Sequence, residues 1–318
     1  MTMPTHIPRQ LLLIALTLIA AIPAAAQHKN KSRHGSRDED GNSRIDTTVS
    51  VSKTVAIDLG ITSGSIKVTS WDKPTVQIRA SSESGDLRFD FSQSRLTLSA
   101  EEQNGGEDAD LELIVPKGAR VTASSIDGDI DVRGVAELDA NTISGSLTAS
   151  DVDGRAILTS VNGDLVASGL GGSVKANDVS GDIQLSDISG DVNVETVSGE
   201  MKLRGVKSSY VRTSTVSGDL TFDGTLDPKG RYEFHSHSGS FTITMPKGTG
   251  AQITLRGYNG ELRSSCQMML MPGDGAGGHN RSQVFTIGNG GAKLSFDTFS
   301  GDVELRGACS GNPKSKEE

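Results

Sequence analysis

The sequence predicts an all-β chain, a single β-solenoid built from coils of about 18–21 residues that turn at Ser-Gly-Asp motifs. The first observation is a glycine period of nine residues. The second is a pair of apolar residues, two and four positions after the glycine, as Ile183 and Leu185 follow Gly181. The third is an aromatic content of only 4%, which suits the thin aliphatic core of a solenoid. The strict period runs through Gly145, Gly154, Gly163, Gly172, Gly181, Gly190 and Gly199.

The same unit recurs outside the strict run, at spacings close to two units. A pair of units is therefore expected to form one coil with two strands and two turns, because alternate residues of a strand share a face. A fixed turn glycine implies either a positive φ or a close backbone approach. We predict structural turn roles for Gly128, Gly145, Gly154, Gly163, Gly172, Gly181, Gly190, Gly199, Gly218, Gly239, Gly260 and Gly301.

The residue between the two apolar positions of each unit is polar, so one face of each strand is expected to be buried and the other wet. A coil of two sheets around a narrow core explains that pattern. The solvent-facing set is Lys67, Asp131, Thr148, Gln184, Asn193, Lys202, Thr221, Thr242 and Glu304.

The beginning of the chain predicts export. Residues 1–26 combine Arg9, an apolar run and a small-residue end, which is typical of a cleaved signal peptide; an uncleaved anchor is the alternative. Residues 27–44 are polar and predict a disordered linker. No later stretch is long and apolar enough to cross a bilayer, so we expect a periplasmic, cell-envelope or extracellular protein.

The solenoid is expected over residues 45–309. A Pro-Lys-Gly step recurs at 116–118 and 246–248, which suggests sub-blocks of about 45–240 and 241–309. Residues 267–283 break the rhythm and predict a loop, and residues 310–318 predict a disordered tail.

The charge of the chain limits the classes of partner that it can bind, and its cysteines suggest one disulfide. The formal net charge is -9, and removal of the signal segment takes away one arginine and no acid. This balance argues against nucleic acid and anionic lipid. The two cysteines, Cys266 and Cys309, are a candidate disulfide in an oxidising compartment, with two buried thiols as the alternative.

The motifs that could carry chemistry favour structural interpretations. The acid that follows many turn glycines is typical of turn hydrogen bonding; a calcium ladder would need a different ligand spacing. His235 and His237 share a strand face but lack further ligands, so we predict no metal site and no cofactor. No hydrolase elbow, phosphate loop or zinc-protease motif is present, so we predict no catalytic residues.

Three stretches resemble a bacterial exported β-strand-repeat family of unknown function, often labelled "putative adhesin". They are residues 61–68 with Trp71-Asp72, residues 196–203, and residues 298–305, together with the Pro-Lys-Gly steps. The resemblance covers about residues 45–306. It implies an envelope-associated β-solenoid with no known catalytic residues.

The function we expect is a non-enzymatic, adhesin-like scaffold or binding module of the cell envelope. Its partner would be an envelope glycan or a protein, bound by the exposed polar rows. One alternative is a structural protein that self-assembles through its strand edges. A second is a β-helix enzyme that acts on polysaccharide.

Overall fold

The computed structural model describes residues 33–34, 36–37, 42–83, 85–101, 108–257, 260–271 and 282–307, and every regular element in them is a β-strand. They belong to one compact unit, Ser32–Glu318. The predicted signal segment 1–26, the tail 310–318 and Cys309 lie outside the described residues. Within the described ranges, no helix has the length and apolarity that a membrane span requires.

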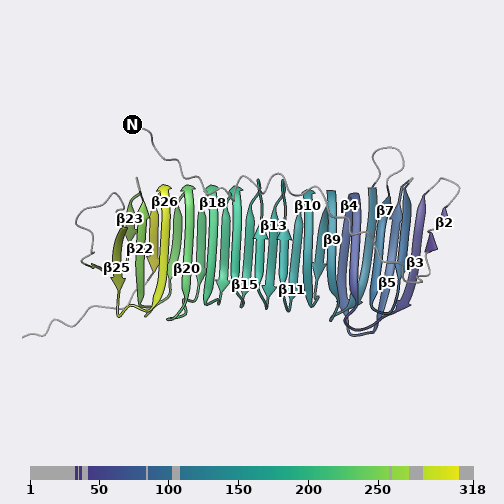
Figure 1. Ribbon diagram of the computed structural model, residues 1–318, viewed down its shortest axis with the longest axis horizontal. Helices are drawn as coiled ribbons and strands as arrows, with labels where there is room; N and C mark the ends of the chain where they lie inside the picture. Colours follow the sequence, from purple (N-terminus) through teal and green to yellow (C-terminus); the bar gives the residue numbers. More distant parts are fainter. Residues whose placement is uncertain are drawn as a thin grey trace, which may run out of the picture. The chain divides into compact units, whose positions relative to one another are not determined.

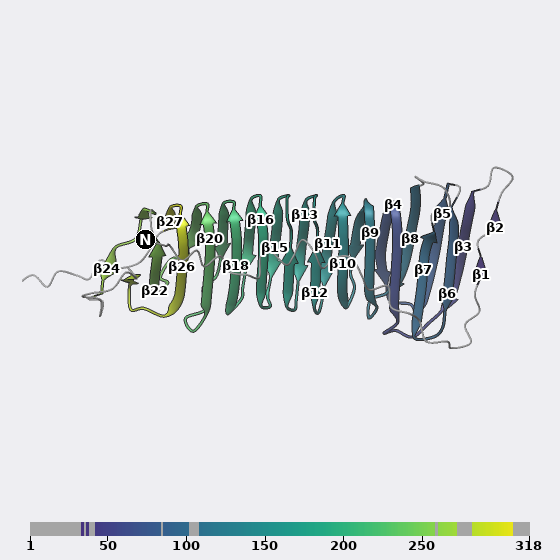
Figure 2. The ribbon, with the colours of Figure 1, turned by 45° about the horizontal axis from the view of Figure 1, so that its top comes forward.

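The central strands form two facing sheets of parallel strands (Figures 1 and 2). The long β9 (Arg120–Arg133) contributes its first half to one sheet and its second half to the other. The first sheet continues with β10 (Glu137–Ser144), β12 (Ala156–Thr159), β14 (Val174–Asn177), β16 (Val192–Ser198), β18 (Tyr210–Ser217) and β20 (Arg231–Ser238). The second sheet continues with β11 (Leu147–Val152), β13 (Leu165–Leu170), β15 (Ile183–Ile188), β17 (Met201–Val206), β19 (Leu220–Gly224) and β21 (Phe241–Met245).

The register confirms the predicted solenoid and its coil length. Paired residues are 18 apart at Leu165↔Ile183, 19 apart at Val192↔Val211 and 21 apart at Val211↔Tyr232. The chain alternates between the sheets, so each coil contains one strand of each.

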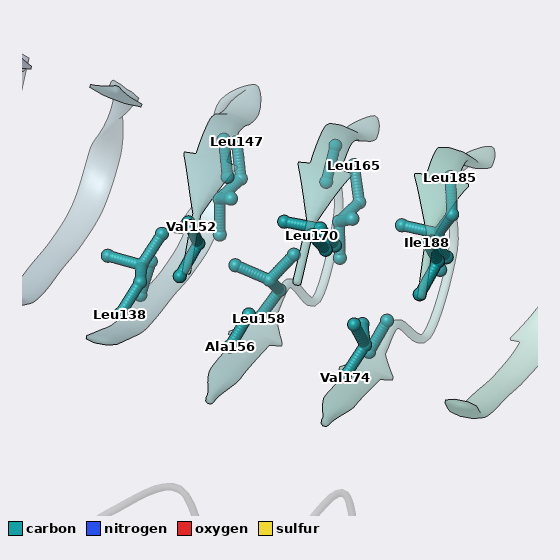
Figure 3. Close-up of a cluster of buried hydrophobic side chains, with 14 of the residues drawn as sticks. Leu138, Leu147, Val152, Ala156, Leu158, Leu165, Leu170, Val174, Leu185 and Ile188 are labelled. Atoms are coloured by element: carbon teal, nitrogen blue, oxygen red, sulfur yellow. The ribbon is translucent and has the colours of Figure 1, made fainter. Parts of the chain in front are cut away.

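The core is the narrow space between the sheets. Figure 3 shows Leu147, Leu165 and Leu185 of the second sheet facing Leu138, Leu158 and Val174 of the first. Residues two and four after the turn glycines are buried as predicted, except after Gly260, where Leu262 and Ser264 are half-buried; Ile183 and Leu185, for example, are 0% and 1% exposed. Most aromatic residues of the core gather near the C-terminal end, where Phe234 stacks on Phe296 with ring centroids 5.0 Å apart, and Phe89 is buried near the N-terminal end.

At one position the second-sheet strands bend through the left-handed region. Asp151 and Asp187 have φ of 55° and 54°, and Gly169 and Gly205, in the coils between and after them, have φ of 66° and 63°. Asp tolerates this conformation better than most residues because its short side chain bonds locally. Asp and Gly therefore alternate at this bend, coil by coil.

The coils do not follow chain order at the ends of the solenoid. Near the C-terminus, β26 (Ala292–Ser300) inserts between β20 and β22 (Ala251–Gly257), as Figure 1 shows, and β27 (Val303–Gly307) inserts between β21 and β23 (Leu262–Ser264). Near the N-terminus, β4 (Ala56–Trp71) lies between β9 on one side and β7 (Arg95–Glu101) and β8 (Asp108–Pro116) on the other. At both ends, therefore, strands that are neighbours in space are not consecutive coils in the chain.

Antiparallel strands close both ends. At the N-terminal end, β3 (Ser43–Ser50) pairs with β5 (Thr75–Ser82), β5 with β8, and β6 (Asp86–Phe91) with β7. The short β1 (Arg33–His34) and β2 (Ser36–Arg37) pair with β6 and β3, within the segment predicted as a linker. At the C-terminal end, β25 (Ser282–Ile287) pairs with β22 and β24 (Met268–Leu270). The predicted loop 267–283 thus begins and ends in strand, and its central part, 272–281, lies outside the described residues.

Candidate functional site

The predicted turn glycines lie at the two corners where the chain passes between the sheets. One corner holds Gly154, Gly172 and Gly190, and the other holds Gly128, Gly145, Gly163, Gly181, Gly199, Gly218, Gly239, Gly301 and Gly260. Close approach is the common reason for glycine here. A Cβ on Gly145 would lie 2.5 Å from the carbonyl oxygen of Gly128, whereas φ is in the left-handed region at only some of these positions. We call the second set the glycine corner.

The acids that follow the glycine corner bind backbone amides of the next coil. Asp182 accepts a hydrogen bond from the Glu200 amide at 2.9 Å, and Asp164 accepts one from the Asp182 amide at 3.1 Å. Asp129, Asp219 and Asp302 make the same contact. These carboxylates therefore tie coil to coil. No group of acids, histidines or cysteines in the described part of the chain is arranged to hold a metal ion.

A row of buried polar side chains lies inside the glycine corner, three residues before each glycine. All members but one carry hydroxyl groups. Those of Thr142, Ser160 and Thr196 donate to backbone carbonyls, Thr196 to that of Ser198 at 3.1 Å, whereas four other hydroxyls of the row have no hydrogen-bond partner. Asp178 is the one acid of the row; it is 3% exposed, and neither carboxyl oxygen has a hydrogen-bond partner of good geometry. We call this the inner polar row: Ser125, Thr142, Ser160, Asp178, Thr196, Thr215, Ser236 and Thr298.

Burial raises the pKa of Asp178 to about 6 from its ordinary 3.8. The amides of Val179 and Ser180 and the Ser160 hydroxyl lie close enough to oppose this shift, but they do not cancel it. Asp178 has no path to a surface ligand in this position, so we interpret it as a structural group and not as part of a binding site.

The candidate binding site is a shallow hollow of about 220 Å³ on the outer face of the first sheet. It lies across β12, β14, β16 and the start of β18. This volume is below the roughly 300–1,000 Å³ of sites that enclose a small molecule. A ligand would therefore lie against the face. The polar and aromatic lining residues are Arg155, Ser173, Lys175, Asp191, Asn193 and Tyr210.

The strand register brings these side chains together. Ala156, Val174, Val192 and Val211 are paired in successive coils, so the residues just before them form one outer row and the residues just after them form the next. The first row contains Arg155, Ser173, Asp191 and Tyr210, and the second contains Lys175 and Asn193. Their positions follow from coil length rather than from any local motif.

The lining combines an aromatic face with charged and amide groups. Arg155, Lys175 and Asp191 are exposed, and Tyr210 is half-buried. The Asn193 amide donates to Glu195 at 3.2 Å, and its carbonyl oxygen is buried with no partner. The hollow therefore offers donors, a carboxylate acceptor and a ring surface within one site.

Sequence reasoning placed Asn193 on the wet face but missed the other lining residues. Of the predicted wet set, Asn193 lies on the first sheet, whereas Lys67, Asp131, Thr148, Gln184, Lys202, Thr221, Thr242 and Glu304 lie on the second. The nine-residue period alternates between the sheets, so it could not separate the side chains of one face from those of the other. Counting by whole coils, from Arg155 to Ser173 and Asp191, would have found the row.

The two histidines of the sequence analysis lie apart from this hollow, on β20. His235 Nδ1 is 3.8 Å from an Asp297 oxygen, and the His237 ring stacks on Phe299 at 4.9 Å. Burial, followed by the nearby Arg212 guanidinium, lowers the pKa of His235, so its imidazole is neutral at pH 7. Each histidine thus has a neighbour that explains it structurally.

The predicted disulfide stays a prediction. Cys266 is 6% exposed at the end of the second sheet, and its amide is bonded to the Ser264 hydroxyl at 3.0 Å. Its expected partner, Cys309, lies outside the described residues.

The family model described as Toastrack DUF4097 matches residues 94–306. No curated protein matches the chain. Among solved structures, the chain is similar to a protein described as a putative cell adhesion protein from Clostridium sporogenes. The identity is 8%, the similarity covers 88% of this chain and 100% of that one, and the TM-score is 0.27.

Proposed function

The chain belongs to the Toastrack DUF4097 family, and from that premise we propose that it is an exported, adhesin-like binding module of the cell envelope. The outer face of its first sheet would bind an envelope glycan. The observation that carries the proposal is the hollow lined by Arg155, Lys175, Asp191, Asn193 and Tyr210.

A glycan fits the chemistry of the hollow. Sugar hydroxyls can donate to the Asp191 carboxylate, and they can accept from Arg155 and Lys175. The Tyr210 ring offers an apolar surface to the C–H groups of a sugar ring. Because the hollow is shallow and the face continues beyond it, an extended polymer suits it better than a single enclosed sugar.

We propose binding without catalysis. Glycoside hydrolysis normally uses two carboxylates on either side of the scissile bond. Among the described residues that line the hollow, Asp191 is the one acid. A reducing-sugar assay on envelope polysaccharides tests the enzymatic alternative, and release of sugar ends would contradict this part of the proposal.

The binding experiment compares the exported chain with Tyr210→Ala and Lys175→Ala on a glycan array and on isolated envelope fractions. Removal of a central aromatic side chain typically raises the dissociation constant of an interface about tenfold, and we expect that effect for Tyr210→Ala. Lys67→Ala is the matched control, since Lys67 is exposed on the outer face of the second sheet. Loss of retention in the first two variants and normal retention in the control would support the site. Equal retention of all variants, or no retention of the unaltered chain, would overturn it.

A further inference from the structure

A second feature of the first sheet is a continuous outer row, two residues before each glycine of the glycine corner. It consists mainly of aliphatic side chains that point away from the core. Ile126, Ile143 and Phe299 are 52%, 42% and 52% exposed. The valines between them are half-buried. In spatial order, the outer row is Ile126, Ile143, Val161, Val179, Val197, Val216, His237 and Phe299.

The strand register makes this row continuous. Single bridges join Ser144 to Asn162, Asn162 to Ser180 and Ser180 to Ser198, so the residues just before them are neighbours too. Ladder pairs continue the row from β16 to β18, β20 and β26. Neighbouring strands are about 4.8 Å apart, so the row is about 34 Å long.

Outside this row, the large apolar side chains that reach high exposure among the described residues are Val166 and, in and beside β24, Met269, Leu270 and Met271; the last three are 70%, 62% and 42% exposed. On the outer face of the second sheet, within the described residues, Val166 is the one large apolar side chain that reaches high exposure, at 40%. Contiguous apolar rows that are rimmed by polar residues are typical of interaction surfaces. The residues on both sides of the central valines are mostly uncharged: Asn141, Thr159, Asn177, Glu195 and Ser214 on one side, and Ser144, Asn162, Ser180, Ser198 and Ser217 on the other.

We propose that the outer row is the interface through which two copies of this chain pair side by side, antiparallel, about a two-fold axis. A partner that packs along the whole row must repeat at the strand spacing, and a second copy does so by construction. A two-fold interface also requires a self-complementary surface. The row meets this requirement because the residues directly beside its central valines are mostly uncharged, so like charges would not meet at the middle of the interface.

The axis passes between Val179 and Val197, at the middle of the row. It places Val179 against Val197 of the second copy and Val161 against Val216. At the ends it places Ile143 against His237 and Ile126 against Phe299, so that the aromatic end of one copy covers the isoleucine end of the other. With flanking rows included, each copy would bury about 500 Å², or about 1,000 Å² in total, which is the lower limit for a specific interface.

This arrangement leaves the hollow uncovered. Arg155 and Val161 lie at opposite ends of the same outer face, about 20 Å apart along the chain direction. A dimer would therefore present two hollows, which increases avidity for a polymer. The dimer itself does not depend on the glycan proposal, and the experiment below contains no glycan.

The experiment is sedimentation equilibrium of the exported chain between about 1 and 500 µM, because an interface of this size gives weak association. We expect a monomer–dimer equilibrium. Val179→Lys would place like charges beside the axis and raise the dissociation constant at least about tenfold. Val166→Lys, the same change on the other face, should leave the constant unchanged. Far-UV circular dichroism checks that both variants keep the fold.

Three outcomes would overturn the proposal. One is an unaltered chain that is monomeric throughout the concentration range, which would leave the row to a different partner. Another is equal weakening by Val179→Lys and Val166→Lys. The third is growth beyond a dimer that Val179→Lys does not affect, which would instead indicate association through the strand edges at the ends.

Discussion

The buried carboxyl of Asp178 gives the sharpest test of how this solenoid is stabilised. It occupies a position in the inner polar row where other coils have serine or threonine. A hydroxyl there can donate to the backbone, as those of Thr142, Ser160 and Thr196 do; Thr196 donates to the Ser198 carbonyl at 3.1 Å. An ionised carboxylate has no proton to donate, and neither of its oxygens has a hydrogen-bond partner of good geometry. We predict that Asp178→Asn and Asp178→Thr stabilise the protein at neutral pH.

The expected gain follows from the pKa of Asp178, which burial raises to about 6 from 3.8. Each pKa unit is worth about 1.4 kcal/mol, so the ionised group destabilises the folded state by about 3 kcal/mol at high pH. Because the folded pKa is the higher one, folding takes up a proton between the two values. The destabilisation is therefore absent below about pH 4, grows as the pH rises to about 6, and then stays constant.

The assay is urea unfolding of the unaltered chain and both variants at several pH values between about 4 and 7.5, with the free energy of unfolding compared at each. The comparison isolates position 178, because every other side chain is the same in all three proteins. Since a solenoid can open locally, hydrogen exchange at the Ser160 and Asp178 amides, bonded to Asn177 and Glu195, gives a local measure. A constant difference between variant and unaltered chain over this pH range would refute the reasoning.

Three other predictions concern the corners and the cysteines. Gly190→Val should lower the free energy of unfolding by about 1–3 kcal/mol in thermal or urea unfolding, because a Cβ there would overlap the Gly172 carbonyl oxygen. The control is Gly60→Val, which should be nearly neutral because the nearest neighbour of its Cβ would be Ser99 Cβ at 3.9 Å. Equal effects of the two substitutions would show that close approach is not the cause. Asp182→Ala removes the acceptor of the Glu200 amide and should lower the free energy of unfolding in urea by about 1–2 kcal/mol. Asp223→Ala, on the exposed surface of β19, is the control and should leave that free energy unchanged within experimental error. If Cys266 and Cys309 are paired, Cys266→Ser should lower the free energy of unfolding by about 3–4 kcal/mol. Alkylation of the unreduced protein should then add no label, as measured by mass spectrometry. Two labelled thiols would contradict the pairing.

The glycine period predicted the coil, its two strands and its buried positions. This was possible because each coil contacts mainly its neighbours, so a local pattern of apolar residues determines which side chains face the core. Ile183 and Leu185 illustrate this, since their spacing from Gly181 was enough to predict their burial. The acids after the glycines were also recognisable as structural, although their partner amides in the next coil were not.

The nine-residue period concealed a difference between the two corners. Two residues before Gly172 the chain has Leu170, which is fully buried, and two residues before Gly145 it has Ile143, which is 42% exposed. The two positions look alike in sequence. They differ because the bends at Asp151, Gly169, Asp187 and Gly205 shift the alternation of facing in one strand of the coil and not in the other.

The amino-acid sequence by itself determined the repeating coil, because fixed glycines and alternating apolar residues allow only one way to bury a continuous aliphatic core. Only the tertiary structure decided which strands are neighbours at the two ends, where β4 and β26 insert out of chain order. It also decided which side chains meet on the outer faces, including the hollow beside Tyr210 and the outer row. The physical reason is that these surface neighbours are a whole coil apart in the chain, so their contact depends on register between coils and leaves no local pattern.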